Sequence, residues 1–400
     1  MPAAHFFADD PAQVGLDPAK VQALMERAER EIKEGILPAC QIAIARNGRI
    51  GAMRSFGRVT LGGVEKPATN ETLFIIMSAT KAIVVSCGWL LMQEGKLDLR
   101  ERVADIVPEF GTNGKDIITV DQLLSYTSGF PNAPYAQKEW LDRGKRLERF
   151  AKWRLEYEPG TRFHYAPTSN MWVLAEIIER RGGRDFREFA RERVAKPLGL
   201  PDLMLGIARA QSSRVADVTY VGQPPTQEEY RKAGLPGKIL AVETEVTESA
   251  ILGFNDPLVR EAGVPGGGGI MTAGDLALFY QALLHDGRAF DGAQIWHPEI
   301  LREARRVRTN AFIDPRNGFK SNRGLVLEIA GDDGHANVRG FGRTNSPQAF
   351  GHPGAAGQLG WADPATGISL AYLTNGFDRN DLREGRRMVA ISSQAAGCAA

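Results

Sequence analysis

The sequence lacks the residue patterns typical of metal, redox and nucleotide-binding proteins. Its 400 residues contain three cysteines, Cys40, Cys87 and Cys398. They are widely spaced and odd in number, which argues against a disulfide framework and a cysteine zinc site. The six histidines form neither a His-x-His nor a His-Glu-x-x-His pair, so we expect no metal site. Because no Gly-x-Gly-x-x-Gly follows a strand pattern, we also expect no dinucleotide, and hence no cofactor.

The sequence also lacks an excess of one charge and a long apolar run. The net charge is +1 at pH 7, so no overall field favours nucleic acid or a membrane surface. No apolar run approaches the roughly 20 residues of a membrane span. The first ten residues lack the basic start and apolar core of a signal peptide. We therefore expect a soluble, cytoplasmic protein that binds neither nucleic acid nor a membrane. No pattern predicts an oligomeric state.

One apolar helix dominates the N-terminal half of the sequence. Residues 82–91 contain no turn residue, and the pattern predicts a helix from about Ser78 to Gln93 with Gly95 as its C-cap. The side chains of this helix are apolar on nearly every face, which predicts that the helix is buried. Its first turn carries Ser78 and, three residues later, Lys81, so the two side chains share one face.

Serine and lysine at this spacing indicate nucleophilic catalysis. A serine hydroxyl attacks efficiently only when a neighbouring base removes its proton. Lysine is such a base when it is neutral, and both burial and the positive end of a helix favour its neutral form. The alternative interpretation is that Ser78 simply caps the helix. Ser78 and Lys81 form the only Ser-x-x-Lys in the chain, at the entry of its most apolar helix, where lysine is otherwise costly to bury.

Three further stretches are candidates for the same site. Residues 159–166 form a turn followed by aromatic residues, and Tyr165 there is either a proton carrier beside a lysine or a packed tyrosine. Residues 350–357 are glycine-rich and contain His352, so that a backbone amide there is a candidate oxyanion donor and the histidine is otherwise structural. The glycines 266–269 lack the Gly-Lys-Ser/Thr of a phosphate loop, and close backbone approach beside a pocket explains them better.

The order of the predicted elements indicates an α/β (α+β) fold. A helix over residues 14–33 precedes a hairpin whose turn is Asn47-Gly48 and whose strands cover 41–45 and about 50–56. Helical patterns recur at about 118–124, 137–153, 169–182 and 184–195, and residues 205–265 are irregular. Thr272 and Asp275 form a capping pair for a helix to Leu284. Strands return at 324–329, 358–362 and 368–373, and a helix over 381–392 closes the chain. The simplest fold is one antiparallel sheet built from both ends and flanked by helices, with a helical region inserted.

Taken together and in this order, these stretches resemble the serine β-lactamase and penicillin-binding-protein superfamily, in particular the class C β-lactamase branch and family VIII carboxylesterases. The likeness runs from about Leu16 to Val389 and includes 124–129, 159–163, 265–269 and His352-Pro353-Gly354. It implies a sheet domain formed by 1–75 and 290–400. It also implies a mainly helical domain over 76–289, with the 205–265 loop region near the active site.

The resemblance also implies roles for single residues. Ser78 would be the nucleophile that forms an acyl-enzyme, Lys81 would accept its proton, and Tyr165 would share that work and activate water. The backbone amides of Ser78 and Ala355 would form the oxyanion hole. Four residues would contact the substrate: His352, Gly354, Tyr126 and Asn170.

Two departures from the family pattern bear on the substrate. The second motif is often Tyr-x-Asn, whereas this chain has Tyr165-Ala166-Pro167, and Asn170, three residues later, is the candidate to replace the missing amide. The third motif is usually Lys-Thr-Gly in β-lactamases, whereas here His352 replaces the lysine and a permanent cation is lost. Histidine at this position resembles the esterase branch.

The sequence therefore predicts a serine hydrolase acting on a small-molecule ester or amide, most simply a carboxylesterase for small or medium acyl chains. The alternatives are a β-lactamase, D-amino-acid peptidase or amidase with the same residues, and an acyltransferase that uses an alcohol or amine instead of water. A non-catalytic ligand-binding homologue is the alternative outside enzymes. The intact Ser78, Lys81 and Tyr165 argue against it, and Pro167 argues for it.

Overall fold

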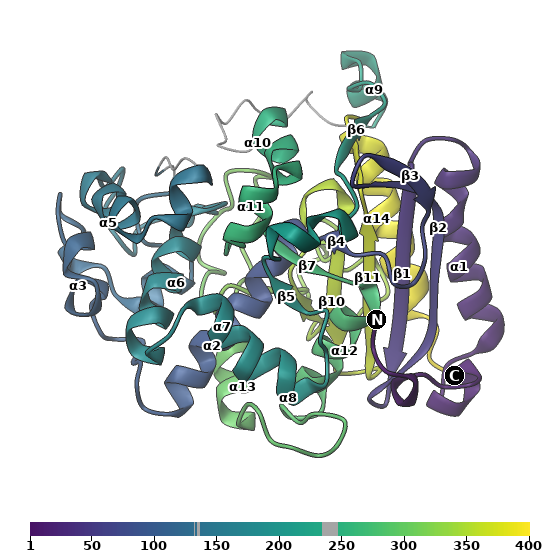
Figure 1. The fold of residues 1–400 in the computed structure, drawn as a ribbon, viewed down its shortest axis with the longest axis horizontal. Coiled ribbons are helices and arrows are strands. Elements are labelled where there is room, and N and C mark those ends of the chain that lie inside the picture. The colour runs from purple at the N-terminus through teal and green to yellow at the C-terminus, as the bar shows by residue number, and fades with distance from the viewer. Residues whose placement is uncertain (132, 134–136, 234–246) are drawn as a thin grey trace.

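The computed structural model describes residues 1–131, 133, 137–233 and 247–400, and it places a sheet beside a mainly helical region (Figure 1). Residues 234–246, part of the segment 205–265 predicted to be irregular, lie outside the described residues. Among the described helices, none is long and apolar enough to cross a membrane.

The central element is an antiparallel sheet that joins the two ends of the chain. In the described part of the chain it has seven strands in the order β3-β2-β1-β11-β10-β9-β8. β1 pairs with β11, so that Ile42 lies opposite Tyr372 and Ala43 opposite Ala371. This pairing confirms the predicted sheet shared by both ends. The strands are β1 (Ala39–Arg46), β2 (Arg49–Leu61), β3 (Val64–Pro67), β8 (Glu328–Ile329), β9 (Phe350–Gly351), β10 (Leu359–Asp363) and β11 (Ile368–Thr374).

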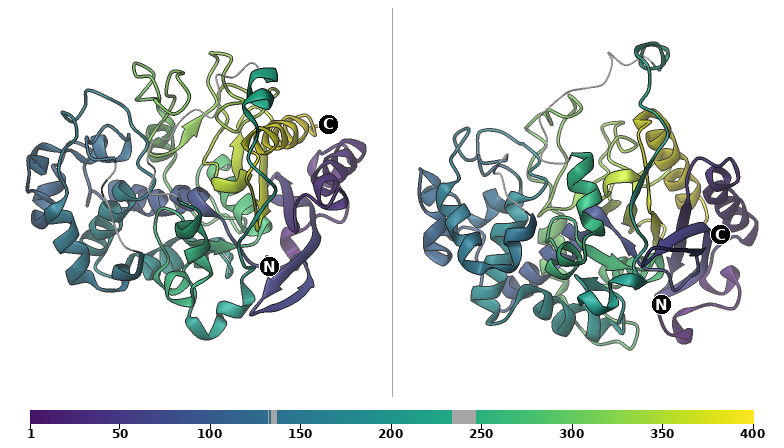
Figure 2. Two further views of the ribbon diagram at one scale, coloured as in Figure 1. Left: turned by 90° about the horizontal axis from the view of Figure 1, so that it is seen from above. Right: turned by 45° about the horizontal axis from the view of Figure 1, so that its top comes forward.

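Helices cover both faces of this sheet (Figure 2). Ile42 and Ile44 of β1 pack in one core with residues of α1 and α14, whereas Ala43 and Ala45 pack in the other core with α12. The alternation of large and small residues along β1 therefore sets the distance of each helix layer, since small side chains let a helix come close. These helices are α1 (Pro18–Lys33), α12 (Ala273–Leu284) and α14 (Asp381–Ala396).

The hairpin turn and the capping pair have the predicted geometry. Asn47 and Gly48 both have positive φ, of 53° and 75°, as a two-residue hairpin turn of this kind requires. The Thr272 side chain accepts from the Asp275 backbone N–H and thereby caps α12. The second strand runs on to Leu61, beyond the predicted limit, and a Gly-Gly turn then leads to β3, which the sequence analysis missed.

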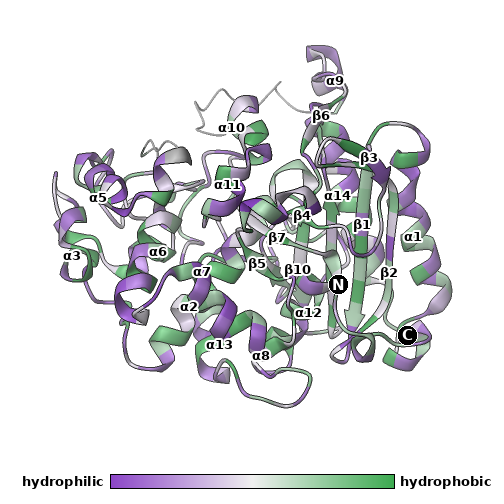
Figure 3. Cartoon of the chain, in the orientation of Figure 1, coloured by the Kyte–Doolittle hydropathy of each residue, from purple (hydrophilic) through white to green (hydrophobic). Residues whose placement is uncertain are grey.

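The helix α2 (Thr80–Gln93) is the buried axis of the helical region. Every residue from Thr80 to Leu91 is buried, which confirms the predicted burial. Ser78 lies just before it, in a single 3-10 turn, Met77–Ala79. The helix α6 (Ser169–Gly182) packs against α2. Figure 3 shows how hydrophobic residues gather along the inner strands while the outer helices carry more hydrophilic ones.

Shorter elements complete the molecule. The helices are α3 (Val103–Ile106), α4 (Val120–Leu124), α5 (Arg143–Lys152), α7 (Phe186–Ala190), α8 (Lys196–Leu198), α9 (Gln227–Lys232), α10 (Glu248–Leu252), α11 (Pro257–Ala262) and α13 (Pro298–Arg305). The remaining strands are β4 (Phe74–Ile75), β5 (Met204–Leu205), β6 (Thr219–Val221), β7 (Gly269–Met271) and β12 (Gly376–Asp378). The limits of the two domains stay a prediction; α12, within the range assigned to the helical domain, packs on the sheet.

The strand predicted over 324–329 is wrong for most of its length. Only Glu328 and Ile329 belong to a strand, β8. Val326 has a φ of 66°, a left-handed conformation that is rare for a β-branched residue and incompatible with an extended strand. Its N–H donates to the carbonyl of Leu124 at 2.7 Å, so this loop connects the sheet edge to the helical region.

Candidate active site

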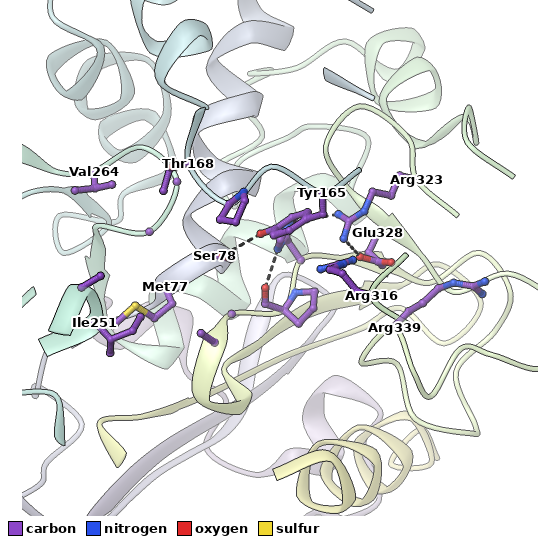
Figure 4. A pocket seen from close by; sticks show the side chains of 18 of the residues that line it. Met77, Ser78, Tyr165, Thr168, Ile251, Val264, Arg316, Arg323, Glu328 and Arg339 are labelled. Carbon is purple, nitrogen blue, oxygen red and sulfur yellow. Dashed lines mark hydrogen bonds and ion pairs between the residues drawn. The ribbon is translucent and has the colours of Figure 1, made fainter. Parts of the chain in front are cut away.

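A cavity of about 550 Å³ opens beside Ser78. Figure 4 shows its two sides: Met77, Ile251 and Val264 line one, and Arg316 and Arg323 line the other. Ala250, Ile251, Phe254 and Val264 of its wall come from the segment 205–265. Ser78 is partly exposed at the boundary between the apolar and the charged side. A substrate in this cavity therefore meets apolar groups on one side of the serine and ionised groups on the other.

Lys81 lies beneath Ser78 and is completely buried. Its Nζ donates to Ser78 Oγ at 3.0 Å and to the Gly266 carbonyl at 2.6 Å. Burial lowers the pKa of Lys81, an effect that Tyr165 opposes and the charges of Arg323 and Arg316 strengthen. Among the described residues no ion pair joins a carboxylate to Lys81, so the Tyr165 phenol is the group whose negative charge favours the protonated lysine.

Tyr165 approaches Ser78 from the other side. Its hydroxyl donates to Ser78 Oγ at 3.0 Å, and the Lys81 Nζ lies 5.3 Å from the centre of its ring. Burial by itself raises the pKa of Tyr165. The positive charges of Lys81 and Arg323 and the hydrogen bonds with Ser78 and Lys81 outweigh burial, so the pKa lies below its ordinary value. The structure thus brings together the three residues that the sequence analysis selected for catalysis.

The glycine run 266–269 allows the backbone to reach Lys81. A Cβ on Gly266 would lie 2.7 Å from the Pro167 carbonyl oxygen and 3.5 Å from Lys81 Nζ. A Cβ on Gly269 would lie 2.7 Å from Thr80 Oγ1. Close backbone approach beside a pocket, predicted for this run, is therefore what the glycines provide.

The segment with His352 lies against the turn that carries Ser78. A Cβ on Gly354 would lie 2.5 Å from the Ile76 carbonyl oxygen, so only glycine permits this approach. Ala355 follows at the first position of a 3-10 turn, Ala355–Gly357, where a backbone N–H has no partner within the turn. Ser78 likewise lies in a 3-10 turn at the start of a helix. Both residues line the cavity, as the predicted oxyanion hole requires.

His352 lines the cavity as an uncharged ring. It is 2% exposed, and burial, followed by the charges of Arg323 and Lys81, holds its pKa well below its usual range. Its Nδ1 lies 2.8 Å from the Pro353 carbonyl oxygen, which only accepts, so Nδ1 carries the proton. The side chain of His352 therefore does not supply the permanent positive charge that a lysine would supply at this position.

Tyr126 and Asn170, predicted to contact substrate, do not line this cavity. The ring of Tyr126 is buried 5.1 Å from that of Tyr165 and supports it from behind. Asn170 donates to the Leu123 carbonyl at 2.7 Å and accepts from Ser128 Oγ at 3.3 Å. Its amide is therefore occupied within the helical region. Pro167, which stands where the family motif has asparagine, lines the cavity.

The charged side of the cavity was missed by the sequence analysis. It consists of Arg316, Arg323, Glu328, Arg339 and Glu384. The first four lie in or beside loops within an arginine-rich stretch, which in a single sequence resembles any solvated segment. Burial raises the pKa of Glu384 to about 7, an effect that the charge of Arg387 opposes.

Strained backbone surrounds the site. Met77, Tyr126, Val326 and Ala356 all have positive φ, between 48° and 68°. Met77 and Ala356 flank the two segments that carry Ser78 and Ala355, and Tyr126 and Val326 lie behind Tyr165. Non-glycine residues hold this conformation only where the surrounding structure enforces it, as it commonly does at functional sites.

Comparison with known proteins agrees with this geometry. The family model described as Beta-lactamase matches residues 19–394. The "Esterase/beta-lactamase LipL" of Mycobacterium tuberculosis is 27% identical over 326 residues, covering 77% of this chain and 70% of that protein. The crystal structure of a family VIII carboxylesterase superposes with a TM-score of 0.77 at 24% identity, covering 95% of this chain and 99% of that one. The D-amino acid amidase from Ochrobactrum anthropi superposes with a TM-score of 0.65 at 19% identity, covering 94% and 98%. Because the family match spans nearly the whole chain and the structural likeness agrees with it, this chain belongs to the beta-lactamase family.

Proposed function

We propose that this chain is a serine hydrolase that forms an acyl-enzyme through Ser78 and acts on esters of small or medium acyl chains. The observation that carries the proposal is the convergence of Lys81 Nζ and Tyr165 OH on Ser78 Oγ, each at 3.0 Å. The hydroxyl becomes a nucleophile once either neighbour has lost its proton. The pKa values of Lys81 and Tyr165 both lie below their ordinary values, which favours that state.

In the acylation step, the deprotonated member of the Lys81–Tyr165 pair takes the Ser78 proton as Oγ attacks the ester carbonyl carbon. The backbone N–H groups of Ser78 and Ala355 donate to the oxygen that becomes negative. As the bond to the alcohol oxygen breaks, the pair returns the proton to the departing alcohol. The acyl group is then bound to Ser78 Oγ.

In the deacylation step, a water molecule gives a proton to the same pair and attacks the acyl carbon. The bond from that carbon to Ser78 Oγ breaks, and Oγ regains a proton from the pair. One ester and one water have become one acid and one alcohol. Tyr165, which lines the cavity while Lys81 lies beneath it, is the member of the pair in reach of that water.

The cavity supports an ester rather than a β-lactam substrate. Met77, Ile251, Phe254 and Val264 offer an apolar side for an acyl chain. His352 is uncharged, so the carboxylate of a β-lactam or a peptide loses the contact that a lysine at this position would make. The arginines that line the cavity are each paired with a carboxylate of the protein itself. A cytoplasmic location is also proposed, because the three cysteines are free and buried, as thiols are in a reducing compartment.

The test compares wild type with Ser78→Ala on p-nitrophenyl butyrate and on a chromogenic cephalosporin. We expect the wild type to prefer the ester and the variant to lose at least about 10³-fold of its turnover, as on removal of a nucleophile. A fluorophosphonate should add covalently to the wild-type peptide that contains Ser78. Faster turnover of the cephalosporin would identify a β-lactamase instead, and the absence of any covalent adduct would identify a binding protein.

A further inference from the structure

Arg323 is the buried cation on the charged side of the cavity. It is 2% exposed, and it forms an ion pair with Glu328. Figure 4 shows this pair directly beside Tyr165. The guanidinium lies 5.0 Å from the centre of the Tyr165 ring and 5.3 Å from that of Tyr126. Arg323 therefore faces the aromatic side of the catalytic centre from within the protein.

Two acceptors fix the guanidinium in place. Besides Glu328, the carbonyl of Val326 accepts from Arg323 Nη1 at 3.0 Å. Val326 is the residue whose backbone is held in the left-handed conformation, and its own N–H donates to the Leu124 carbonyl. A strained loop anchored to the helical region thus positions this arginine, which is the kind of cost that structures retain at functional sites.

The same guanidinium adds to the effect of burial that keeps His352 uncharged. Arg323 Nη1 lies 3.4 Å from His352 Nε2. Since Nδ1 carries the proton toward the Pro353 carbonyl, Nε2 is bare and accepts from the arginine. A second proton on this ring would meet a fixed positive charge, so the ring stays neutral.

We propose that Arg323 is the fixed cation of this centre: a positioning residue that keeps the Lys81–Tyr165 pair short of one proton and His352 uncharged. It thereby supplies the permanent charge that His352 itself does not carry. The inference rests on the proposed function in one respect, namely that the Lys81–Tyr165 pair takes the proton of Ser78. The placement of the charge is independent of that function.

The neighbouring charges make Arg323 the effective one. Its field lowers the pKa of Lys81 and of His352 beside the larger effect of burial. It also lowers the pKa of Tyr165, which burial raises and which the charge of Lys81 lowers more strongly. Arg316 also lies over the Tyr165 ring, at 4.3 Å, and is paired with a carboxylate as Arg323 is, but its side chain is 39% exposed. Solvent screens an exposed charge far more than a buried one.

Other titratable groups near the pair act differently. Burial raises the pKa of Tyr126 well above its ordinary value, so this phenol stays protonated. Glu328 carries the charge that opposes Arg323. Glu384, with a pKa of about 7, lines the same cavity and adds its own titration to any activity profile. Tyr165 must therefore be observed directly, not only through turnover.

The test is a titration of Tyr165 by NMR, in full-length protein carrying tyrosine labelled with ¹³C at the ring carbon bearing the hydroxyl, with Tyr165→Phe to assign the signal. We expect Arg323→Gln to raise the apparent pKa of Tyr165 by at least about one unit, because a cation beside the phenolate is gone. We expect Glu328→Gln to lower it, because Arg323 then acts unopposed. Arg323→Lys should retain most of the wild-type value.

Ester hydrolysis provides the second readout. In Arg323→Gln the acid limb of the kcat/KM profile should move to higher pH. At a pH below this limb the variant should be about tenfold slower than wild type, and at a pH above it the two rates should converge. The matched control is Arg146→Gln. Arg146, on α5, is also buried, and it donates to Glu179 at 2.7 Å and to the Trp140 carbonyl at 3.2 Å. Its loss should leave the Tyr165 titration and the position of the acid limb unchanged.

Two results would overturn the proposal. An unchanged Tyr165 titration in Arg323→Gln, with a rate reduced equally at every pH, would make Arg323 structural only. If that variant does not fold, Glu328→Gln decides, and a Tyr165 titration that fails to move to lower pH contradicts the inference. The NMR titration does not depend on turnover. A wild type without ester hydrolysis would therefore refute the proposed function, and the Tyr165 titration would still decide the role of Arg323.

Discussion

Among the lysines whose burial the structure describes, two are completely buried, Lys81 and Lys115, and of these Lys81 lies beside the proposed nucleophile. Burial lowers the pKa of both, that of Lys115 to about 8. The Lys115 Nζ donates to the Thr112 carbonyl at 2.7 Å, to that of Trp153 and to Thr112 Oγ1 at 3.3 Å. The Thr112 hydroxyl already donates its proton to the Ala151 carbonyl at 2.6 Å and does not line the cavity, whereas Lys81 donates to the Ser78 hydroxyl at 3.0 Å. A carbonyl oxygen has no proton to give. Burial therefore makes a lysine easier to deprotonate, and only the group it faces makes it a base.

The surroundings of the two lysines differ in the same sense. Lys115 opens a single 3-10 turn, Lys115–Ile117, and does not line the cavity. Lys81 does not line the cavity either. Ser78 and Tyr165, however, are hydrogen-bonded to each other and line the cavity, so they connect Lys81 to the substrate. The comparison predicts that the two lysines divide the roles of stability and catalysis between them.

The largest expected effect comes from exchanging one lysine and then the other for alanine. Lys81→Ala should lower ester turnover by at least about 10²-fold, because Ser78 loses its proton acceptor. Lys115→Ala should leave turnover within about threefold at a temperature where it is folded, and lower the denaturation midpoint, since two buried carbonyls lose their donor. Turnover and urea denaturation are measured on both variants. Equal losses of turnover in the two would end the distinction.

A smaller effect is expected from the two tyrosines that flank the site. Tyr165→Phe should lower turnover by about 10²-fold, because the phenol shares the proton of Ser78. Tyr126→Phe is the matched control: its ring contacts that of Tyr165, but its buried hydroxyl has no hydrogen-bond partner among the described residues. That variant should keep near-normal turnover and lose no stability. A comparable loss in Tyr126→Phe would restore the substrate contact predicted for it from the sequence.

Much of the fold and of the catalytic centre was predictable, because short-range patterns encode it. The spacing of Ser78 and Lys81 on one helix face depends only on helix geometry. Asn47-Gly48 specifies its hairpin through two positive φ angles, and the apolar stretch after Lys81 specifies a buried helix. For Tyr165 the residues alone left open a proton carrier or a packed tyrosine, and the resemblance to a known family favoured the first; the structure has its hydroxyl 3.0 Å from Ser78 Oγ.

The charged side of the cavity was not predictable for the opposite reason. Arg323 lies 158 positions after Tyr165 and reaches it through a loop whose course depends on Val326, and no local propensity predicts a left-handed valine. The strand predicted over 324–329 failed at the same residue. Alternating apolar residues are typical of a strand, but here the hydrogen bond from Val326 to Leu124 determined the conformation.

The smallest expected effect isolates Lys115 through the pH dependence of stability. Its pKa is about 8 in the folded chain, whereas the ordinary value of a lysine is 10.5. Between these pH values the unfolded chain therefore binds more protons than the folded chain. Stability conferred by this group therefore rises as pH increases from about 8 to 10.5, because the buried ammonium becomes neutral. Lys115→Met removes the titration. Between about pH 7.5 and about pH 10, wild type should gain ~2 kcal/mol of unfolding free energy relative to the variant, measured by urea denaturation. Cysteines and tyrosines that titrate in this range act equally in both proteins, so the difference belongs to Lys115. If wild type and variant showed the same pH dependence, the carbonyl partners of Lys115 would be keeping it charged. Burial would then lower the pKa of a lysine in this fold only where a group such as the Ser78 hydroxyl or the Tyr165 phenol shares its proton.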